Sequence, residues 1–386
     1  MSRIRVLFMT GSLNPGGTER NILHLATGLD KSRFDVAVYS DYEGEPIQAE
    51  LRRRGVSCHA LKGRPSVGEP FLKRLFLRNL PYQWRMWNVF RAHRRAVIHA
   101  FGFPMIYYAV ILAWLAGRRK LIFAVQDWDV WKKSPVYRVL DRVCSRLANY
   151  IVADGKGAGR LAVERQGMDA RKLLTVYDGV NTKELSPTQS AEATRQELGL
   201  SPTRPLAGVI ARLDVAKKGQ DVFLQAVPDI VRHVPRAQCV LVGDGPDRAR
   251  IEALVAAMPE AARPVMAGFR EDLANVIQCL DVVVIPSQWE SVPKTLVESM
   301  WLGRAVVATR VGDIEEVLDD TCGVLVPPND PGALAEAVAS LMIDGSRRER
   351  LGLAAHERIV ERGLTLDHSL QQVERLYSEL AGCTEP

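Results

Sequence analysis

Two glutamates, Glu290 and Glu298, lie eight positions apart, after an apolar strand pattern at Val282–Ile285. The first falls in the loop that follows the strand, and the second falls within the next predicted helix. Carboxylates accept hydrogen bonds from paired sugar hydroxyls. This spacing would place one carboxylate on a group bound in a cleft and the other deeper along the cleft. A helix N-terminal charge together with an exposed helix glutamate explains the same pattern without a ligand.

A cationic loop follows another predicted strand, Leu206–Ile210, and carries Arg212, Lys217 and Lys218. Open α/β sheets bind ligands at the carboxyl ends of their parallel strands, and a pyrophosphate group requires positive charge there. The loop therefore predicts a phosphate contact, although a solvated basic loop has the same composition.

Two glycine turns join predicted strands to helices. One includes Gly16 and Gly17, and the other includes Gly243 and Gly245. Glycines let the backbone turn tightly and direct amides at an anion, to which the helix N-terminus adds partial positive charge. A plain strand-to-helix turn explains both segments as well, and the first does not have the spacing of the G-x-G-x-x-G dinucleotide fingerprint.

The elements that position these residues alternate between short apolar runs and segments of helical period. This alternation predicts an α/β fold with two doubly wound parallel sheets. A stretch rich in Ser, Thr, Pro and Glu, residues 181–205, is the predicted linker. The predicted strands lie near Arg5–Met9, Phe34–Tyr39, Val97–Ala100, Leu121–Val125, Tyr150–Ala153 and Leu174–Val176, and then near Leu206–Ile210, Cys239–Val242, Val282–Ile285, Ala305–Ala308 and Gly323–Val326.

The order of these motifs resembles that of the retaining GT-B glycosyltransferases of family 4, over nearly the whole chain. The resemblance rests on Arg212-Leu213 with Lys218-Gly219, then Gly243–Pro246, Glu290–Glu298, Gly303–Ala308 and Val311-Gly312. It implies two Rossmann-like domains that face a cleft. Residues 1–182 would bind the acceptor, residues 204–360 would bind a nucleotide-sugar donor, and a helix at 365–382 would return to the first domain.

The resemblance also implies a role for each matched residue. Arg212 and Lys218 match the pair that holds the donor diphosphate and stabilises the leaving nucleotide. Glu290 matches the glutamate near the donor sugar, and Glu298 matches the one that accepts from the ribose hydroxyls. Donor contacts are further expected from the glycine pair Gly16 and Gly17, from the glycines Gly243 and Gly245, and from Ser291, Val292, Pro293, Lys294 and Thr295.

The sequence departs from the family pattern at several of these places. Lys217 is an alternative to Lys218, because the family loop commonly has one residue fewer before its lysine. Ser291-Val292 stands in place of the usual Gly-Phe, which leaves the donor open. Gln126 occupies the position where many members carry a histidine.

His99, at the end of a predicted strand, resembles a recurrent family histidine at the edge of the cleft and is counted as catalytic; a buried core histidine is an equal alternative. Asp127-Trp128-Asp129 resembles the metal-binding D-x-D of the other major glycosyltransferase fold. We reject that role because the cationic loop already neutralises a diphosphate, and we expect neither a metal nor a cofactor.

Charge is divided unevenly along the chain. Residues 1–190 hold 31 Lys and Arg against 16 Asp and Glu, a net +15, and the remainder holds 20 against 29, a net −9. Between Leu51 and Gln126, 15 basic residues accompany one acid, Glu69, and they interleave with Trp84, Trp87 and Phe90. This pattern predicts contact with an anionic membrane surface and hence a lipid-linked, lipopolysaccharide or exopolysaccharide acceptor; a packed helix with a solvated basic face is the alternative.

The six cysteines form no close pair, and no signal peptide or membrane span is evident, so we expect a cytoplasmic protein that is peripheral at the inner face of the cell membrane. A nucleotide-sugar epimerase of the same fold and a retaining synthase with a soluble acceptor are alternative functions. No nucleic-acid motif is present, and the acidic second half argues against a nucleic-acid partner.

Overall fold

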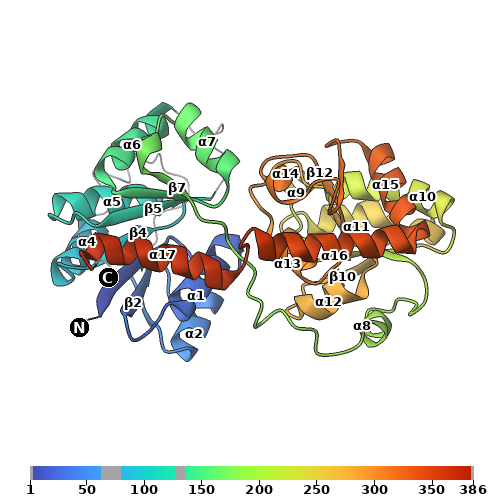
Figure 1. Cartoon of the computed structure of the whole chain (residues 1–386), viewed down its shortest axis with the longest axis horizontal. Coiled ribbons are helices and arrows are strands. Elements are labelled where there is room, and N and C mark those ends of the chain that lie inside the picture. Colours follow the sequence, from blue (N-terminus) through green and yellow to red (C-terminus); the bar gives the residue numbers. More distant parts are fainter. Residues whose placement is uncertain (1–2, 62–79, 127–134, 384–386) are drawn as a thin grey trace. The chain divides into compact units, whose positions relative to one another are not determined.

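The structure is a computed structural model that describes residues 3–61, 80–126 and 135–383. It consists of two units, Met1–Asp178 with Asp367–Pro386 and Gly179–Leu366 (Figure 1). Each unit is a parallel sheet with helices on its faces, so the predicted α/β class with two doubly wound sheets is confirmed.

The sheet of the first unit has the strand order β3-β2-β1-β4-β5-β6-β7. The chain runs outward from β1 on one side and from β4 on the other, so the topological switch point lies between these two strands. The strands are β1 (Ile4–Met9), β2 (Phe34–Ser40), β3 (Ser57–Ala60), β4 (Val97–Ala100), β5 (Leu121–Val125), β6 (Tyr150–Ala153) and β7 (Leu173–Thr175).

Side-chain alternation on β1 separates the two helical layers of this unit. Leu7 and Met9 join the core under the helices α4, α5 and α6, whereas Phe8 meets Tyr377 of the C-terminal helix on the other face. The helices are α1 (Gly17–Gly28), α2 (Pro46–Arg53), α4 (Leu80–Ala92), α5 (Met105–Leu115), α6 (Pro135–Leu147), α7 (Lys156–Glu164) and the 3₁₀ turn η2 (Ala170–Lys172).

The C-terminal helix α17 (Leu366–Ala381) returns to the first unit, as the resemblance implied (Figure 1). Tyr377 is fully buried between Phe8 and Phe34. The Glu374 carboxylate accepts a hydrogen bond of 3.0 Å from the backbone N–H of Asp30, after α1. The helix therefore completes one face of the first sheet.

The sheet of the second unit has the order β10-β9-β8-β11-β12-β13, with its switch point between β8 and β11. The strands are β8 (Leu206–Ile210), β9 (Gln238–Val242), β10 (Val265–Gly268), β11 (Val282–Ile285), β12 (Ala305–Thr309) and β13 (Val324–Val326).

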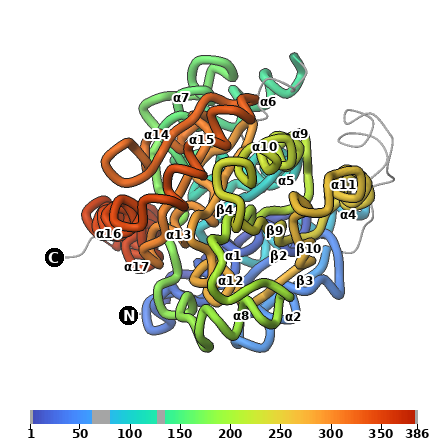
Figure 2. Tube along the Cα trace, turned by 90° about the vertical axis from the view of Figure 1, so that its right-hand side faces the viewer, coloured from blue at the N-terminus to red at the C-terminus, as the bar shows by residue number. Residues whose placement is uncertain are grey.

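Helices α10 and α15 lie side by side on one face of this sheet, where Phe223, Val227 and Val338 are buried (Figure 2). The helices of the unit are α8 (Ala191–Glu197), α9 (Val215–Lys218), α10 (Gln220–His233), α11 (Arg248–Ala256), α12 (Leu273–Cys279), α13 (Lys294–Trp301), α14 (Ile314–Val317), α15 (Pro331–Ile343), α16 (Gly345–Glu361) and the 3₁₀ turn η3 (Glu260–Ala262).

The predicted linker, residues 181–205, packs on the second unit rather than connecting freely. The Asn275 side chain accepts hydrogen bonds from the backbone N–H groups of Thr188 and Gln189. Arg195 of α8 is buried, and its guanidinium donates to the Asp281 carboxylate at 3.0 Å. The polar composition of this stretch thus serves fixed contacts.

Two strands that the sequence did not predict, β3 and β10, lie at the outer edges of the two sheets. Both strands have four residues. Cys58 is the only residue of β3 that is buried, and no residue of β10 is buried. Because their residues are mostly exposed or half-exposed, these two strands carry no continuous run of buried apolar residues, whereas the edge strands β7 and β13 were predicted. The apolar pattern consequently reveals the central strands and misses these two.

The stability of the second sheet depends on a glycine in its central strand. A Cβ atom at Gly208 of β8 would lie 2.7 Å from Val240 Cγ1 and 2.8 Å from Leu280 Cδ2. We predict that Gly208→Ala lowers the free energy of unfolding by roughly 1–3 kcal/mol through overpacking. The control Gly332→Ala, whose nearest new contact is 3.5 Å, should leave it within about 0.5 kcal/mol. Equal urea midpoints for the two variants would contradict this account of β8.

Candidate active site

The loops after β8 and β11 meet at the switch point of the second sheet. Gly219 has a left-handed backbone, φ 63°, and a Cβ there would overlap the carbonyl oxygen of Pro286. The backbone N–H of Gln288 donates to the carbonyl of Lys217 at 2.8 Å, and the Thr295 hydroxyl donates to the carbonyl of Ile210 at 3.1 Å. These contacts fix the two loops to each other.

Lys218 and Glu290 form an ion pair across this switch point. Their side chains are 21% and 7% exposed, so the Glu290 side chain is buried while the Lys218 side chain keeps some contact with solvent. The Ser287 hydroxyl donates to the same Glu290 oxygen at 3.1 Å. The structure thus brings together a cation and a carboxylate that the sequence assigned to one site.

The other cations of the loop are placed differently. Arg212 is exposed directly after β8, with no side-chain partner among the described residues, so its guanidinium is available to an anion. The backbone N–H of Lys217 bonds to Asp214, the N-cap of α9, and no partner of the Lys217 ammonium group is found in the described part of the chain. Of the two lysines, only Lys218 meets Glu290.

Close backbone packing requires glycine at positions 243 and 245. Gly243 has φ 139°, and a Cβ there would overlap the carbonyl oxygen of Ala211; a Cβ at Gly245 would overlap that of Leu213. The turn after β9 therefore packs backbone to backbone against the cationic loop. This packing supports the shape of that loop whether or not the glycines contact a ligand.

The segment from Ser291 to Thr295 leads into α13, for which Pro293 is the N-cap. Proline has no N–H group, so Pro293 itself cannot donate to the expected sugar contact. Lys294 and Thr295 form the first turn of the helix. Glu298 is half-buried one turn further along.

In the first unit, the glycine turn is held by a carboxylate of the protein itself. Glu45 is buried and accepts from the Ser12 hydroxyl at 2.7 Å, the Leu13 N–H at 2.5 Å and the Asn14 amide at 3.0 Å. The Ser12 hydroxyl, the Leu13 N–H and the Asn14 side-chain amide are thus already taken. The predicted pair lies further along the turn. A Cβ at Gly16 would overlap the Glu19 carboxylate, whereas a Cβ at Gly17, the first residue of α1, would meet nothing within 4 Å.

His99 is 2% exposed and lies in the core of the first unit. Its Nδ1 atom pairs with the Tyr377 hydroxyl at 2.8 Å, and its ring stacks on Phe101 at 4.2 Å. Burial lowers the pKa of His99 to about 3, so the ring is neutral at neutral pH. These are the contacts of a core histidine, and the predicted catalytic role stays a prediction.

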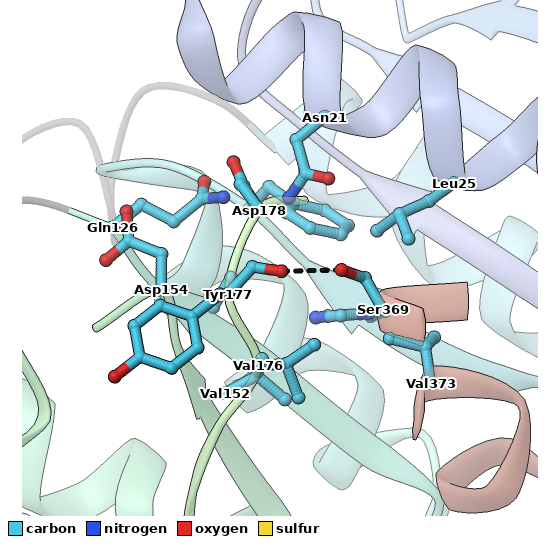
Figure 3. Close-up of a pocket in the computed structure, with 13 residues that line it drawn as sticks. Asn21, Leu25, Gln126, Val152, Asp154, Val176, Tyr177, Asp178, Ser369 and Val373 are labelled. Atoms are coloured by element: carbon cyan, nitrogen blue, oxygen red, sulfur yellow. Dashed lines mark hydrogen bonds between the residues drawn. The ribbon is translucent and has the colours of Figure 1, made fainter. Parts of the chain in front are cut away.

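A small cavity lies beside His99 at the carboxyl ends of β4, β5 and β6 (Figure 3). Gln126 and Asp154 border it, and the Ser369 hydroxyl of α17 closes it by donating to the carbonyl of Tyr177 at 2.7 Å. Its volume of about 20 Å³ holds roughly one water molecule and no sugar ring. Gln126, the departure from the family histidine, thus borders a small cavity of the first unit.

Metal ligands are not assembled in the part of the chain that the structure describes: no group of His, Cys, Asp or Glu there could hold an ion. Asp127 and Asp129 lie outside the described residues.

Sequence reasoning missed the residues that anchor the site, namely Asp214, Ser287 and Gln288. Asp214 has a readable signal, because an aspartate that begins a short helix is a typical N-cap. Gln288 bonds across two loops that are far apart in the sequence, which no local pattern reveals, whereas Ser287 donates to Glu290 three residues further along the same loop.

Two parallel sheets with a cationic loop and a buried carboxylate at one switch point define an α/β protein of the GT-B glycosyltransferase type. The whole chain aligns with the structure of HepE from Anabaena in complex with UDP, with a TM-score of 0.82 and 20% identity over 97% of this chain and 100% of that one. Sucrose-phosphate synthase from Thermosynechococcus elongatus gives a TM-score of 0.77 and 20% identity over 99% and 100%. These similarities establish the fold.

Residues 15–184 match the model of Glycosyltransferase Family 4, and residues 204–344 match that of Glycosyl transferases group 1. D-inositol 3-phosphate glycosyltransferase of Xylanimonas cellulosilytica is 31% identical over 308 residues, 69% of this chain and 70% of that protein. The chain belongs to glycosyltransferase family 4, the group 1 glycosyltransferases. α-D-kanosaminyltransferase of Streptomyces kanamyceticus is 33% identical over 167 residues, but this alignment covers only 42% of the chain and 43% of that relative.

The buried neutral His99 predicts a loss of stability in acid. The unfolded histidine binds a proton near pH 6.5 and the folded one near pH 3, so the stability present above pH 6.5 is lost as the pH falls between these values. Between pH 7 and pH 5 this loss is about 2 kcal/mol. We expect the free energy of unfolding in urea to fall less between pH 7 and pH 5 for His99→Gln than for the wild type, since the other histidines are common to both proteins. An equal decrease of the unfolding free energy in both proteins would contradict the buried neutral state of His99.

Proposed function

We propose that this protein is a retaining glycosyltransferase that moves a sugar from a nucleotide-sugar donor to a hydroxyl of a glycan or lipid-linked acceptor. The observation that carries the proposal is the Lys218–Glu290 ion pair at the switch point of the second unit, beside the exposed Arg212. A cation pair for a diphosphate and a carboxylate for a sugar are what transfer from such a donor requires.

Transfer breaks the bond between the sugar and the diphosphate, so negative charge develops on the leaving phosphate. Arg212 and Lys218 stabilise that charge without a metal. The acceptor hydroxyl attacks the anomeric carbon on the face from which the nucleotide departs, and its proton passes to a phosphate oxygen. Glu290 positions the sugar and need not become covalently bound.

Without a donor, Glu290 forms an ion pair with Lys218, the cation that the diphosphate needs. An incoming diphosphate therefore competes with Glu290 for Lys218, and the released carboxylate becomes an acceptor for sugar hydroxyls. Lys218 thus compensates the buried charge of Glu290 until the donor binds. Glu298, one turn into α13, is the proposed partner of the ribose.

The related proteins support a nucleotide donor and a hydroxylated acceptor. HepE was crystallised with UDP and with UDP-glucose. The curated relatives include a D-inositol 3-phosphate glycosyltransferase and a kanosaminyltransferase, whose names describe sugar transfer. We extend the reaction type to this protein and leave its donor sugar and linkage open.

A membrane-borne acceptor is supported by one helical layer of the first unit. The helices α4, α5 and α6 lie side by side (Figure 1). These helices, together with Phe103 just before α5, carry the large apolar side chains that are exposed in the described part of this unit. These are Leu80, Trp84, Phe103, Trp114, Leu115, Val136, Val139 and Val143. Exposed arginines accompany them, including Arg138, Arg142 and Arg146 on α6. Such a layer suits shallow insertion into an anionic surface.

The structure corrects the aromatic part of the membrane prediction. Phe90 is fully buried in the core, so it cannot insert into lipid, whereas Trp84 is 66% exposed and Trp87 is half-buried. Phe90 faces the sheet because it lies one turn beyond Met86, which is also buried. The surface therefore depends on Trp84 and on the apolar residues of α5 and α6. We propose a cytoplasmic enzyme, peripheral at the inner face of the membrane.

The proposal is tested by incubating the protein with each common nucleotide sugar and measuring nucleotide release, with and without membrane extract and with a chelator present. Release that depends on the extract and survives the chelator supports a metal-independent transferase. An altered free sugar without an acceptor would favour a nucleotide-sugar epimerase, and release stimulated by soluble sugars alone would favour a synthase with a soluble acceptor.

The two glutamates should have different effects. We predict that Glu298→Ala raises the Kd for UDP roughly 10- to 100-fold, because a hydrogen bond to a charged group contributes about 1.5–3 kcal/mol. Glu290→Ala should lower turnover while UDP affinity is kept or raised, since Lys218 loses its competitor. The control Glu252→Ala, an exposed glutamate of α11, should change neither quantity. Small and equal effects at both sites would overturn the assignment.

We also predict that the protein sediments with vesicles of phosphatidylglycerol and phosphatidylcholine, and less with phosphatidylcholine alone. Salt should release it, because surface charges are screened beyond ~10 Å at 0.1 M salt. Replacing Arg91, Arg94 and Arg95 by glutamine should reduce sedimentation. The same loss of charge in the second unit, at Arg232, Arg236 and Arg250, should not. Equal sedimentation of both variants would remove the support for a membrane-borne acceptor.

A further inference from the structure

The carboxyl ends of β1 and β2 in the first unit hold two carboxyl groups that are satisfied to different degrees. Met9 of β1 pairs with Tyr39 of β2, so the residues that follow, Gly11 and Asp41, leave the sheet at the same edge. Glu45 lies close enough to act electrostatically on Asp41. This edge lies next to the switch point of the unit, where parallel sheets bind their ligands.

Glu45 has a structural task that uses both of its oxygens. It accepts from three donors of the glycine turn, the Ser12 hydroxyl, the Leu13 N–H and the Asn14 amide. A carboxylate with this many donors fixes a loop and has little capacity left for a ligand.

Asp41 has a single donor among the residues that the structure describes. The hydroxyl of Tyr82, a buried residue of α4, donates to its Oδ1 atom at 2.6 Å. The Tyr82 ring packs edge-on against Tyr108 of α5 at 5.7 Å, so the hydroxyl is held in place by the core. Tyr82 therefore fixes the direction in which the carboxyl group points.

The second oxygen of Asp41 faces Gly11. A Cβ built on Gly11 would lie 3.8 Å from Asp41 Oδ2, and the described residues provide no hydrogen-bond partner for this oxygen. Gly11 does not have a positive φ, so the backbone conformation does not require glycine there. The missing side chain leaves space directly in front of an oriented carboxyl oxygen.

We propose that Asp41 binds a hydroxyl group of the acceptor, which donates a hydrogen bond to Oδ2 across the space at Gly11. The inference rests on the proposed glycosyl transfer and adds a binding residue to the acceptor side of it. A hydroxyl fits better than a phosphate, because Asp41 and Glu45 together repel an anion. An acidic phosphate of the acceptor must therefore lie elsewhere in the site.

The protonation of Asp41 agrees with this role. Burial and the negative charge of Glu45 raise the pKa of Asp41 to about 7, against the lowering effect of the Tyr82 hydrogen bond. Tyr82 on α4 and Glu45 before α2 are the titratable groups that face it. A hydroxyl that donates to the carboxylate favours the ionised form and lowers the pKa. Acceptor binding should accordingly weaken as the pH falls through 7.

The first experiment needs no known acceptor. The side-chain carboxyl carbon of Asp41 is followed by NMR against pH in the full chain, its signal being assigned with Asp41→Asn. We expect a pKa near 7 that falls when octyl glucoside, glucose or myo-inositol is added at high concentration. An unchanged pKa with all three probes would overturn the inference, whatever the outcome for donor cleavage.

The second experiment separates the acceptor from the donor. With the donor and acceptor found in the nucleotide-sugar screen, Asp41→Asn and Gly11→Ala should each raise the acceptor KM about 10-fold or more. Both should leave the Kd for UDP and the slow hydrolysis of the donor by water unchanged. Asp35→Asn, at the opposite end of β2, serves as the control. If the wild type cleaves a donor and both variants keep the acceptor KM, Asp41 has no such role; if no donor is cleaved, the proposed function itself fails.

Discussion

The ion pair between Lys218 and Glu290 is the interaction on which the second unit's site depends. It joins the loops after β8 and β11, the two strands from which the chain runs in opposite directions across the sheet. Burying a carboxylate costs several kcal/mol unless a partner compensates it. The surrounding backbone contacts, from Gly219 to Pro286 and from Gln288 to Lys217, hold the two charges at contact distance. In the proposed function, a diphosphate replaces the carboxylate at this place.

The first unit depends on a contact of a different kind. Its sheet is completed by α17, a helix from the far end of the chain, and His99 and Tyr377 meet in the core between them. Both groups are polar and nearly without solvent contact, so each requires the other as a hydrogen-bond partner. The cavity beside His99 is accordingly lined by residues of α1, the strand ends and α17 together. Any ligand of this region binds to a surface that exists only once the helix has docked.

The sequence predicted the central strands of both sheets because these strands are buried on both faces and appear as continuous apolar runs. It missed the edge strands β3 and β10, whose residues are mostly half-exposed, although it predicted the other two edge strands, β7 and β13. Glu290 and Lys218 were identified from the order of motifs along the chain. Their contact was not predictable from local pattern, because it depends on two loops separated by 72 residues. Phe90 was misjudged for a related reason, as composition does not tell which side of a helix faces the core.

Three carboxylates of this protein show what composition alone leaves undetermined. Among the described residues, Glu45 is bound by three donors and stabilises a loop, Glu290 is bound by a lysine and a serine, and Asp41 is held by one tyrosine that leaves its second oxygen without a partner. Each lies in a loop after a parallel strand, so position in the fold does not distinguish them. The number of donors does, because a carboxylate whose lone pairs are not all occupied retains capacity for a ligand. On this criterion Glu45 supports the fold, and Glu290 and Asp41 keep capacity for the ligands proposed for them.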